Sequence, residues 1–304
     1  MDNRIFRIGD FIFQIDSPES VRLPENFLLF EIPERDVPEP AQVYQYRIEI
    51  SDHFPEVYGT CVARREDLLA YVSEHGLETR YIGVRGRKEP YACYRETGNA
   101  DALILISPDI VPDMRIDTIF SSLFCLEKRM LERDALILHC AYIVRKRADG
   151  SDEAVLFSAP SETGKSTQAD LWQKYRGTFT VNGDRGLLRR DPKGRWIADG
   201  WPVCGSSGIC HRMAAPIRAI VLLSQEKRNA AERLIPMRAF IGLYSQVTIN
   251  RWNRAENEKA MNLLDALIGS VPVYHLGCDI SEDAVDCLES ALESEYQNFP
   301  NRVY

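Results

Sequence analysis

The sequence predicts a mixed α/β fold, in which a β-rich N-terminal region (1–115) precedes a domain of interleaved strands and helices (116–304). Three observations support this. The first ~110 residues alternate polar with apolar and aromatic residues, as strands do. Beyond them, strand and helix patterns interleave without strict alternation, which favours a mixed sheet over a regular doubly wound one. Finally, an apolar run at 154–158 leads into a small-residue loop and then a helical pattern.

Composition narrows the class of protein. The 304 residues include 37 basic and 45 acidic side chains, and the formal net charge is −8. The sequence has neither an excess of basic residues nor a basic stripe, so we expect no nucleic-acid partner. No apolar run reaches the ~18 to 20 residues of a membrane span, so we expect no membrane partner. Charges scattered through the N-terminus argue against a secretory signal.

The eight cysteines lie far apart, without metal-ligand spacing. We therefore expect a reduced, cytoplasmic protein. The sequence leaves open whether the protein forms a homo-oligomer.

In the N-terminal region we expect strands within "RIFRIGDFIFQI", "VYQYRIEI" and "ETRYIGVRG". The run "REDLLAYVSEHG" predicts a helix over residues 65–76 that ends at Gly76. The proline-rich segment "EIPERDVPEPAQ" predicts a surface connection.

The second region begins with a long helical pattern. Its apolar residues recur at helical spacing: Ile116, Ile119, Phe120, Leu123 and Phe124, with Met130 and Leu131 beyond. Strands are then expected in "ALILHCAYIV", "AVLFS", "TFTVN", "GLLRRD", "GRWIAD", "IRAIVLLS" and "VPVYHLGC". Helices are expected after the loop to about residue 175, around "MRAFIGLYSQ", in "AENEKAMNLLDALIG", closed by Gly269, and in "SEDAVDCLESALES".

The loop "SETGKST" has the residues of a phosphate-binding turn. Such a turn leaves a strand sharply and opens a helix, whose N-terminal partial positive charge faces the anion. Gly164 allows the backbone to approach a phosphate closely, and Lys165 can reach the β- and γ-phosphates. Ser166 is a candidate Mg²⁺ ligand, and Thr167 adds a second hydroxyl. The sequence therefore predicts ATP and Mg²⁺ as ligands.

The loop departs from the usual pattern at its start. Ala159 occupies the first glycine position, and Pro160 removes one N–H donor. If the first position required a positive φ, alanine would cost roughly 1 kcal/mol or more there. The amides of Ser161, Glu162 and Thr163 must then hold the phosphates together with those that follow. The ordinary alternative is a strand–loop–helix turn with Ser161 or Thr163 as N-cap.

A carboxylate follows one predicted helix and one predicted strand later, in "TFTVNGDRGLL". Asp184 can ligate Mg²⁺ or accept the proton of an attacking hydroxyl. Its neighbour Arg185 can balance charge on a transferring phosphoryl group. The alternative is that Asn-Gly-Asp only forms a turn.

Two further stretches are candidates for the same site. His139 shares a strand face with apolar residues, so it is either a core histidine or a group near the γ-phosphate. In "GWPVCGSSGIC", Gly205, Ser206 and Ser207 form either a backbone nest that contacts substrate or a surface turn. The polar run "YSQVTINRW", which includes Gln246 and Thr248, is another candidate to line the site.

Taken in order, "LILHCAYIV", "SAPSETGKST" and "VNGDRGLL" resemble the HPr kinase/phosphorylase superfamily, whose nucleotide fold is of the phosphoenolpyruvate carboxykinase type. The overlap covers about residues 136–224. The resemblance implies a mixed-sheet P-loop core, with residues 161–167 as the loop, His139 beside it and Asp184 acting at the metal and in proton transfer. Ala159 and Glu162 stand where the family has glycines, and Gly183 precedes the acid where the family can have a second one.

The implied function is an ATP- and Mg²⁺-dependent kinase that transfers the γ-phosphate to a hydroxyl of a protein, a peptide or a small molecule. Its catalytic residues would be Asp184, His139, Lys165 and Arg185. A nucleotide-binding sensor without transferase activity is the alternative. A carboxykinase-like lyase is a third interpretation.

Overall fold

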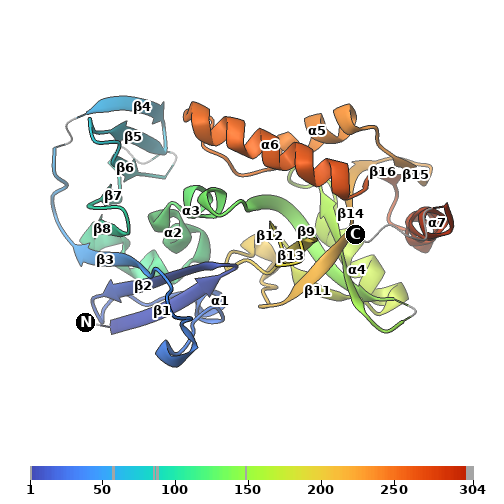
Figure 1. The fold of residues 1–304 in the computed structure, drawn as a ribbon, viewed down its shortest axis with the longest axis horizontal. Coiled ribbons are helices and arrows are strands. Elements are labelled where there is room, and N and C mark those ends of the chain that lie inside the picture. Colours follow the sequence, from blue (N-terminus) through green and yellow to red (C-terminus); the bar gives the residue numbers. More distant parts are fainter. Residues whose placement is uncertain (1, 57–58, 85, 87–88, 148, 299–304) are drawn as a thin grey trace. The chain divides into compact units, whose positions relative to one another are not determined.

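The computed structural model describes residues 2–56, 59–84, 86, 89–147 and 149–298. The chain divides into two units, whose helices and strands are labelled in Figure 1. The first contains the residues up to Arg129 together with Arg251–Arg254, and the second contains the rest. The division falls later than the predicted boundary at 115/116. The reason is packing within the first unit, where the ring centroid of Phe27 lies 5.0 Å from that of Phe120 and 5.8 Å from that of Phe124.

The first unit is built on one sheet. The order of its strands is β1 (Asp2–Ile8), β2 (Phe11–Ser17), β3 (Tyr44–Ile50), β8 (Asp101–Ile106), β7 (Ala92–Glu96), β6 (Glu78–Ile82), β5 (Leu68–Val72) and β4 (Thr60–Arg65). β3 runs parallel to β2 and β8, and the other neighbours are antiparallel. The N-terminal region is thus rich in β-structure.

The predicted helix over residues 65–76 is wrong. These residues belong to the antiparallel pair of β4 and β5, which turns between Arg65 and Leu68. Leu68 and Ala70 are buried while Leu69 between them is half-buried, so the segment follows the two-residue period of a strand. A short apolar run of this kind fits either period in sequence, and pairing with β6 decides between them.

The first unit also contains the short helices α1 (Glu25–Leu28), η1 (Glu34–Asp36), η2 (Pro108–Arg115), α2 (Asp117–Ser121) and η3 (Ser122–Phe124), and the start of α3 (Leu126–Glu132), whose last three residues belong to the second unit. The predicted long helix from residue 116 is therefore interrupted. Cys125 adopts a left-handed conformation with φ of 50° between η3 and α3. Because the chain turns there, Phe124 and Leu126 are both buried.

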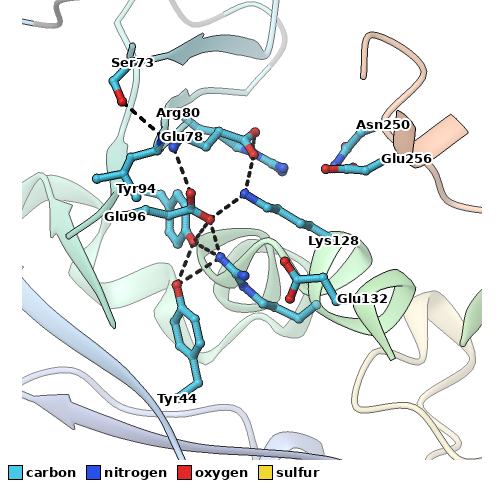
Figure 2. A network of polar contacts seen from close by, with 12 residues as sticks. Tyr44, Ser73, Glu78, Arg80, Tyr94, Glu96, Lys128, Glu132, Asn250 and Glu256 are labelled. Carbon is cyan, nitrogen blue, oxygen red and sulfur yellow. Dashed lines mark hydrogen bonds and ion pairs between the residues drawn. The ribbon is translucent and has the colours of Figure 1, made fainter. Parts of the chain in front are cut away.

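A buried ion-pair network joins α3 to β6 and β7 (Figure 2). Lys128 Nζ lies 2.6 Å from Glu96 and 3.1 Å from Glu78, and Arg129 also pairs with Glu96. Arg80 donates to Glu78 at 2.6 Å. Removing one partner of a buried pair leaves the other charge uncompensated and costs about 3–5 kcal/mol. The network therefore fixes the start of α3 on the sheet.

The sheet of the second unit is mixed. Its strand order is β10 (Asp152–Ser158), β9 (Leu136–Lys146), β12 (Arg185–Arg190), β13 (Trp196–Asp199), β14 (Ala214–Gln225), β16 (Val273–Cys278) and β15 (Ala230–Arg233), and β11 (Phe179–Asn182) pairs with β9. β10 also pairs with β14, so the pairing closes a ring through β9, β12 and β13. The predicted strands of this region are confirmed, and the mixed α/β class with them.

Four helices cover this sheet: α4 (Lys165–Arg176), α5 (Pro236–Tyr244), α6 (Arg254–Ser270) and α7 (Glu282–Asn298). Trp172 of α4 and Leu288 of α7 share one apolar cluster with Phe157 of β10. Leu243 of α5 and Leu264 of α6 belong to a second cluster. Each buried side chain of this kind contributes about 1.5–3 kcal/mol to folding. α6 runs through Gly269, so this glycine does not end the helix as predicted.

Three parallel strands position the loop of interest. β14 pairs in parallel with both β10 and β16. In parallel sheets, ligands bind at the carboxyl ends of the strands. Here those ends are Ser158, Gln225 and Cys278. In the described part of the chain, no helix combines the length and apolarity needed to cross a membrane.

Candidate functional site

The segment between β10 and α4 adopts a tight turn with two left-handed residues. Glu162 has a φ of 65° and Gly164 a φ of 113°. Ala159 does not adopt a positive φ and is instead buried in the core with Phe157 and Trp172. The non-glycine residue that adopts a positive φ is therefore Glu162 and not Ala159. The left-handed conformation costs a residue with a Cβ roughly 1–2 kcal/mol. Left-handed residues within a turn direct successive N–H groups into an anion-binding concavity.

The start of α4 is free of side-chain capping. Its N-cap is Gly164, and among the residues that the structure describes this end of the helix has no side-chain cap hydrogen bond. The alternative with Ser161 or Thr163 as N-cap is therefore wrong. The first N–H groups of a helix have no partner within the helix. Since nothing caps them here, they remain available to an anion, and the helix dipole favours its binding.

Lys165 is buried, with 8% exposure. Its Nζ donates to the carbonyl oxygens of Ala159 at 3.1 Å and Pro160 at 3.2 Å, across the start of the loop. Burial lowers the pKa of Lys165, and the negative charge of Asp184 acts in the opposite direction. The backbone also brings the two segments together, because Cys140 pairs with Ser158 at the end of β10 and donates its N–H to the carbonyl of Asp184 at 2.9 Å.

Asn182 builds the turn that presents Asp184. Its fully buried side chain accepts hydrogen bonds through Oδ1 from the amides of Asp184 at 2.8 Å and Arg185 at 2.9 Å. Its Nδ2 donates to the carbonyl oxygens of Trp201 at 2.8 Å and Val203 at 3.1 Å. Asn182 thus ties this turn to the loop that contains Gly205. No role was predicted for Asn182 from the sequence, although an asparagine whose side chain accepts hydrogen bonds from its own turn is a recognisable signal.

The carboxylate of Asp184 lies between the imidazole of His139 and the guanidinium of Arg185. His139 Nε2 lies 3.4 Å from Oδ1, and Arg185 Nε donates to Oδ2 at 3.1 Å. Burial by itself would raise the pKa of Asp184, but the hydrogen bond from His139 and the charge of Arg185 hold that pKa below its ordinary value. The group therefore remains an ionised acceptor, as a metal ligand or proton acceptor must be.

His139 belongs to the site rather than to the core. Its side chain retains 22% exposure, and its Nδ1 lies 3.2 Å from Gln246 Oε1. The backbone connects the same elements, because the N–H of His139 donates to the carbonyl of Gln246 at 3.0 Å. Ser158 Oγ donates to the carbonyl of His139 at 2.8 Å, which links the histidine to the end of β10.

The polar run after α5 also lines the site. Arg185 Nη1 donates to Thr248 Oγ1 at 2.9 Å. Val247 bridges to Leu138 of β9, so its neighbours Gln246 and Thr248 lie beside the strand that carries His139. Gln246 and Thr248 were weak candidates from the sequence, because the pairing that places them beside His139 joins segments distant in the chain.

The Gly205–Ser207 turn (η4) lies against Asp184. A Cβ on Gly205 would be 3.1 Å from Asp184 Cγ, and a Cβ on Gly183 would be 2.3 Å from Ser207 Oγ. The Ser207 hydroxyl donates to the Cys204 carbonyl at 2.6 Å and accepts from the Ile209 amide at 3.2 Å. Ser207 therefore stabilises the turn. Gly205 and Ser206 are exposed.

A metal ion could be held by few protein groups. Ser166 and Thr167 are exposed at the start of α4, and Asp184 is the acid coupled to Lys165. Among the described residues, no group of three or more His, Cys, Asp or Glu side chains could hold a metal ion. This donor set suits Mg²⁺ bound together with phosphates, because Mg²⁺ usually keeps several waters and takes one or two carboxylates plus substrate oxygens.

No model of a known protein family matches the chain, and no curated protein shows a significant match to it. The similarity to the HPr kinase/phosphorylase superfamily therefore remains a resemblance of short motifs.

Proposed function

We propose that this protein is an ATP- and Mg²⁺-dependent kinase that transfers the γ-phosphate to a hydroxyl group. One observation carries the proposal: the turn that contains Asp184 lies beside the end of β10, from which the loop with Lys165 departs. Cys140 pairs in register with Ser158 at the end of β10 and donates its N–H to the carbonyl of Asp184 at 2.9 Å. A cation at an uncapped helix N-terminus and an ionised carboxylate near it are the groups that phosphoryl transfer requires.

The loop would hold the phosphates. The amides of residues 161–166 and the positive end of α4 supply donors for phosphate oxygens. Lys165 now satisfies its ammonium with the carbonyls of Ala159 and Pro160. On nucleotide binding it would exchange these carbonyls for the β- and γ-phosphates, which are stronger partners because they are charged.

Ser166 and Asp184 would hold Mg²⁺ together with the phosphates. The ion supplies neutralisation of charge on the transferring group. Arg185, held by Asp184 and Thr248, adds a fixed positive charge on the same side.

The acceptor oxygen would attack the γ-phosphorus while the bond to the β-phosphate oxygen breaks, and its proton would pass to Asp184. A carboxylate with a lowered pKa is a weak base. That is sufficient, because phosphoryl transfer proceeds through a loose transition state in which positioning and charge neutralisation supply most of the catalysis. His139 would keep Asp184 ionised and oriented. The exposed turn at Gly205 and Ser206 is where the acceptor would approach.

The direct test is incubation of the pure protein with γ-labelled ATP, Mg²⁺ and fractionated native lysate. We expect label on one class of acceptor, and we expect Lys165→Ala to abolish it. Lys174→Ala is the matched control, because Lys174 is an exposed lysine on the same helix. Tight ATP binding without transfer to any fraction would instead favour the nucleotide sensor. Full activity in Lys165→Ala would contradict both interpretations.

A further inference from the structure

The segment of residues 246–248, which follows α5, pairs with the start of β9. The N–H of His139 donates to the carbonyl of Gln246 at 3.0 Å, and Val247 lies opposite Leu138. These contacts are those of an antiparallel ladder, in which residues directly opposite each other lie on the same face. Gln246 is therefore opposite His139, on the face of β9 that presents the imidazole.

The side chains of this segment alternate between two environments. Val247 is buried, whereas Gln246 and Thr248, which are two residues apart, share the other face. Gln246 Oε1 lies 3.2 Å from His139 Nδ1, and Thr248 Oγ1 accepts from Arg185 Nη1 at 2.9 Å. The imidazole and the guanidinium are the two groups that contact the carboxylate of the proposed catalytic aspartate. Each of the two side chains thus holds one neighbour of that carboxylate.

The hydrogen bonds of Ser245 fix the orientation of the Gln246 amide. Ser245 Oγ lies 2.9 Å from the carbonyl oxygen of Gly242 and 2.9 Å from Gln246 Nε2. A hydroxyl has one hydrogen, and the bond to the carbonyl uses it because a carbonyl oxygen only accepts. Gln246 Nε2 therefore donates to Ser245, and Oε1 of the same amide faces His139. Since Oε1 also only accepts, Nδ1 of His139 carries a hydrogen.

This hydrogen bond selects one of two orientations of the imidazole. Half a turn of the ring about its Cβ–Cγ bond would exchange each nitrogen with a carbon and present a carbon to Asp184. With Nδ1 bonded to Gln246, it is Nε2 that lies 3.4 Å from Asp184 Oδ1. The contact of His139 with the carboxylate therefore depends on Gln246.

Thr248 has the corresponding effect on Arg185. Two different nitrogens of the guanidinium are held, because Nε donates to Asp184 Oδ2 at 3.1 Å while Nη1 donates to Thr248. The guanidinium is planar and rigid, so two such bonds fix its plane relative to the carboxylate.

We propose that Gln246 and Thr248 are positioning residues for Asp184, and that they orient its two carboxylate oxygens through His139 and Arg185. This inference rests on the proposed function, because the orientation of Asp184 affects the rate only if that residue acts in the transfer. Neither positioning residue has to contact the transferring phosphoryl group.

The kinetic experiment measures kcat and the KM for ATP of the full chain, with γ-labelled ATP, Mg²⁺ and the lysate fraction that the wild type labels. Gln246→Met and Thr248→Val keep the side-chain size and remove the hydrogen-bonding groups. Each should lower kcat about tenfold and leave the KM for ATP within about twofold, because the phosphate loop is unchanged. Wild-type kcat in either variant would overturn the role of that residue and leave the proposed function standing.

Conservative variants separate positioning from a general loss of structure. Gln246→Glu keeps an acceptor for Nδ1 and Thr248→Ser keeps the hydroxyl, so each should retain kcat within about threefold of wild type. Gln173→Met and Thr60→Val are the matched controls at exposed positions and should change neither constant. If the conservative variants lost as much activity as Gln246→Met and Thr248→Val, these hydrogen bonds would not position Asp184.

NMR of the ¹⁵N-labelled imidazole tests the contact without any acceptor. At pH 7 the wild type should show a hydrogen on Nδ1 of His139, and this signal should weaken in Gln246→Met. His139→Gln assigns the resonance. Hydrogen on Nε2 alone in the wild type would overturn the positioning by Gln246. A wild type that shows the Nδ1 hydrogen but labels no lysate fraction would instead overturn the proposed function.

Discussion

His139 Nε2 lies 3.4 Å from Asp184 Oδ1, although the two residues come from different strand regions of the second unit. The pairing of β9 with β12 produces this contact, because it sets His139 opposite Arg185, the residue after Asp184. The imidazole thus contacts the carboxylate on one side and Gln246 on the other. The interactions around Asp184 lead to the first three predictions.

Asp184→Asn should abolish phosphoryl transfer, with a loss of at least about 100-fold, because the amide can neither ligate Mg²⁺ well nor accept the proton. Binding of metal-free ATP should persist, since Lys165 and the loop amides are unchanged. Rates of label transfer and calorimetric titration separate the two effects. Asp170→Asn, at an exposed aspartate on α4, is the matched control. Transfer at the wild-type rate in Asp184→Asn would remove this residue from the mechanism.

The pH dependence of transfer should follow the lowered pKa of Asp184. A depressed pKa keeps the carboxylate ionised as pH falls from 7 to the ordinary aspartate value near 3.9, and activity is lost only below it. His139→Gln removes a hydrogen bond that lowers this pKa, so the acid limb of the pH–rate profile should move to higher pH. His75→Gln, at an exposed histidine, should not move it. If the acid limb of the pH–rate profile were unchanged in His139→Gln, the contact with His139 would not lower the pKa of Asp184.

Asn182→Ala should lower the free energy of unfolding by about 2–4 kcal/mol. The substitution removes two hydrogen bonds from half-buried amides and two hydrogen bonds to buried carbonyl oxygens, and each group left unsatisfied carries a desolvation cost. Urea denaturation measures the change. Asn262→Ala, at an exposed asparagine on α6, should stay within about 0.5 kcal/mol of wild type. A similarly small change at Asn182 would mean that the turn does not depend on this side chain.

The backbone of the loop is testable at Glu162. Because its φ is 65°, Glu162→Gly should be more stable than Glu162→Ala by about 1 kcal/mol. The same pair of substitutions at Asp170, inside α4, should give the opposite order, since glycine is unfavourable in a helix by about the same amount. Thermal unfolding of the four variants compares the two positions. If the alanine variant were more stable than the glycine variant at Glu162 as well as at Asp170, a left-handed residue in the loop would be ruled out.

Glu96 should contribute to the stability of the first unit above acid pH. Burial would raise its pKa, but Lys128 and the other partners of the network hold that pKa below its usual value. A depressed carboxyl pKa gives stability that is fully present above the unfolded value near 4.3 and is lost as pH falls through the folded value. Glu96→Gln should therefore destabilise the protein at pH 7 by about 3–5 kcal/mol, and the difference from wild type should shrink in acid.

Chemical denaturation at several pH values checks this prediction. Glu74→Gln is the control, because Glu74 is 87% exposed. If the destabilisation by Glu96→Gln stayed constant down to pH 3, the negative charge of Glu96 would not be the source of its contribution to stability.

Local sequence predicted the order of elements in the second unit except for β15, and the candidates in the loop. The apolar run of β10, the glycine at the start of α4 and the Asn-Gly-Asp turn each carry their own signal, because turn and helix-end chemistry depends on a few neighbouring residues. Local sequence was insufficient at residues 65–76, where burial against β6 selects a strand, and at Cys125, where the chain turns so that the residues on both sides are buried.

The sequence by itself determined which residues are candidates for the proposed chemistry: a lysine and hydroxyls at a helix start, and a carboxylate in a later turn. The tertiary structure alone decided what surrounds them. Asn182, Gln246 and Thr248 contact the candidate residues. These partners are distant in the chain, and strand pairing brings them together. No local pattern specifies such a contact, because it depends on the register of the whole sheet.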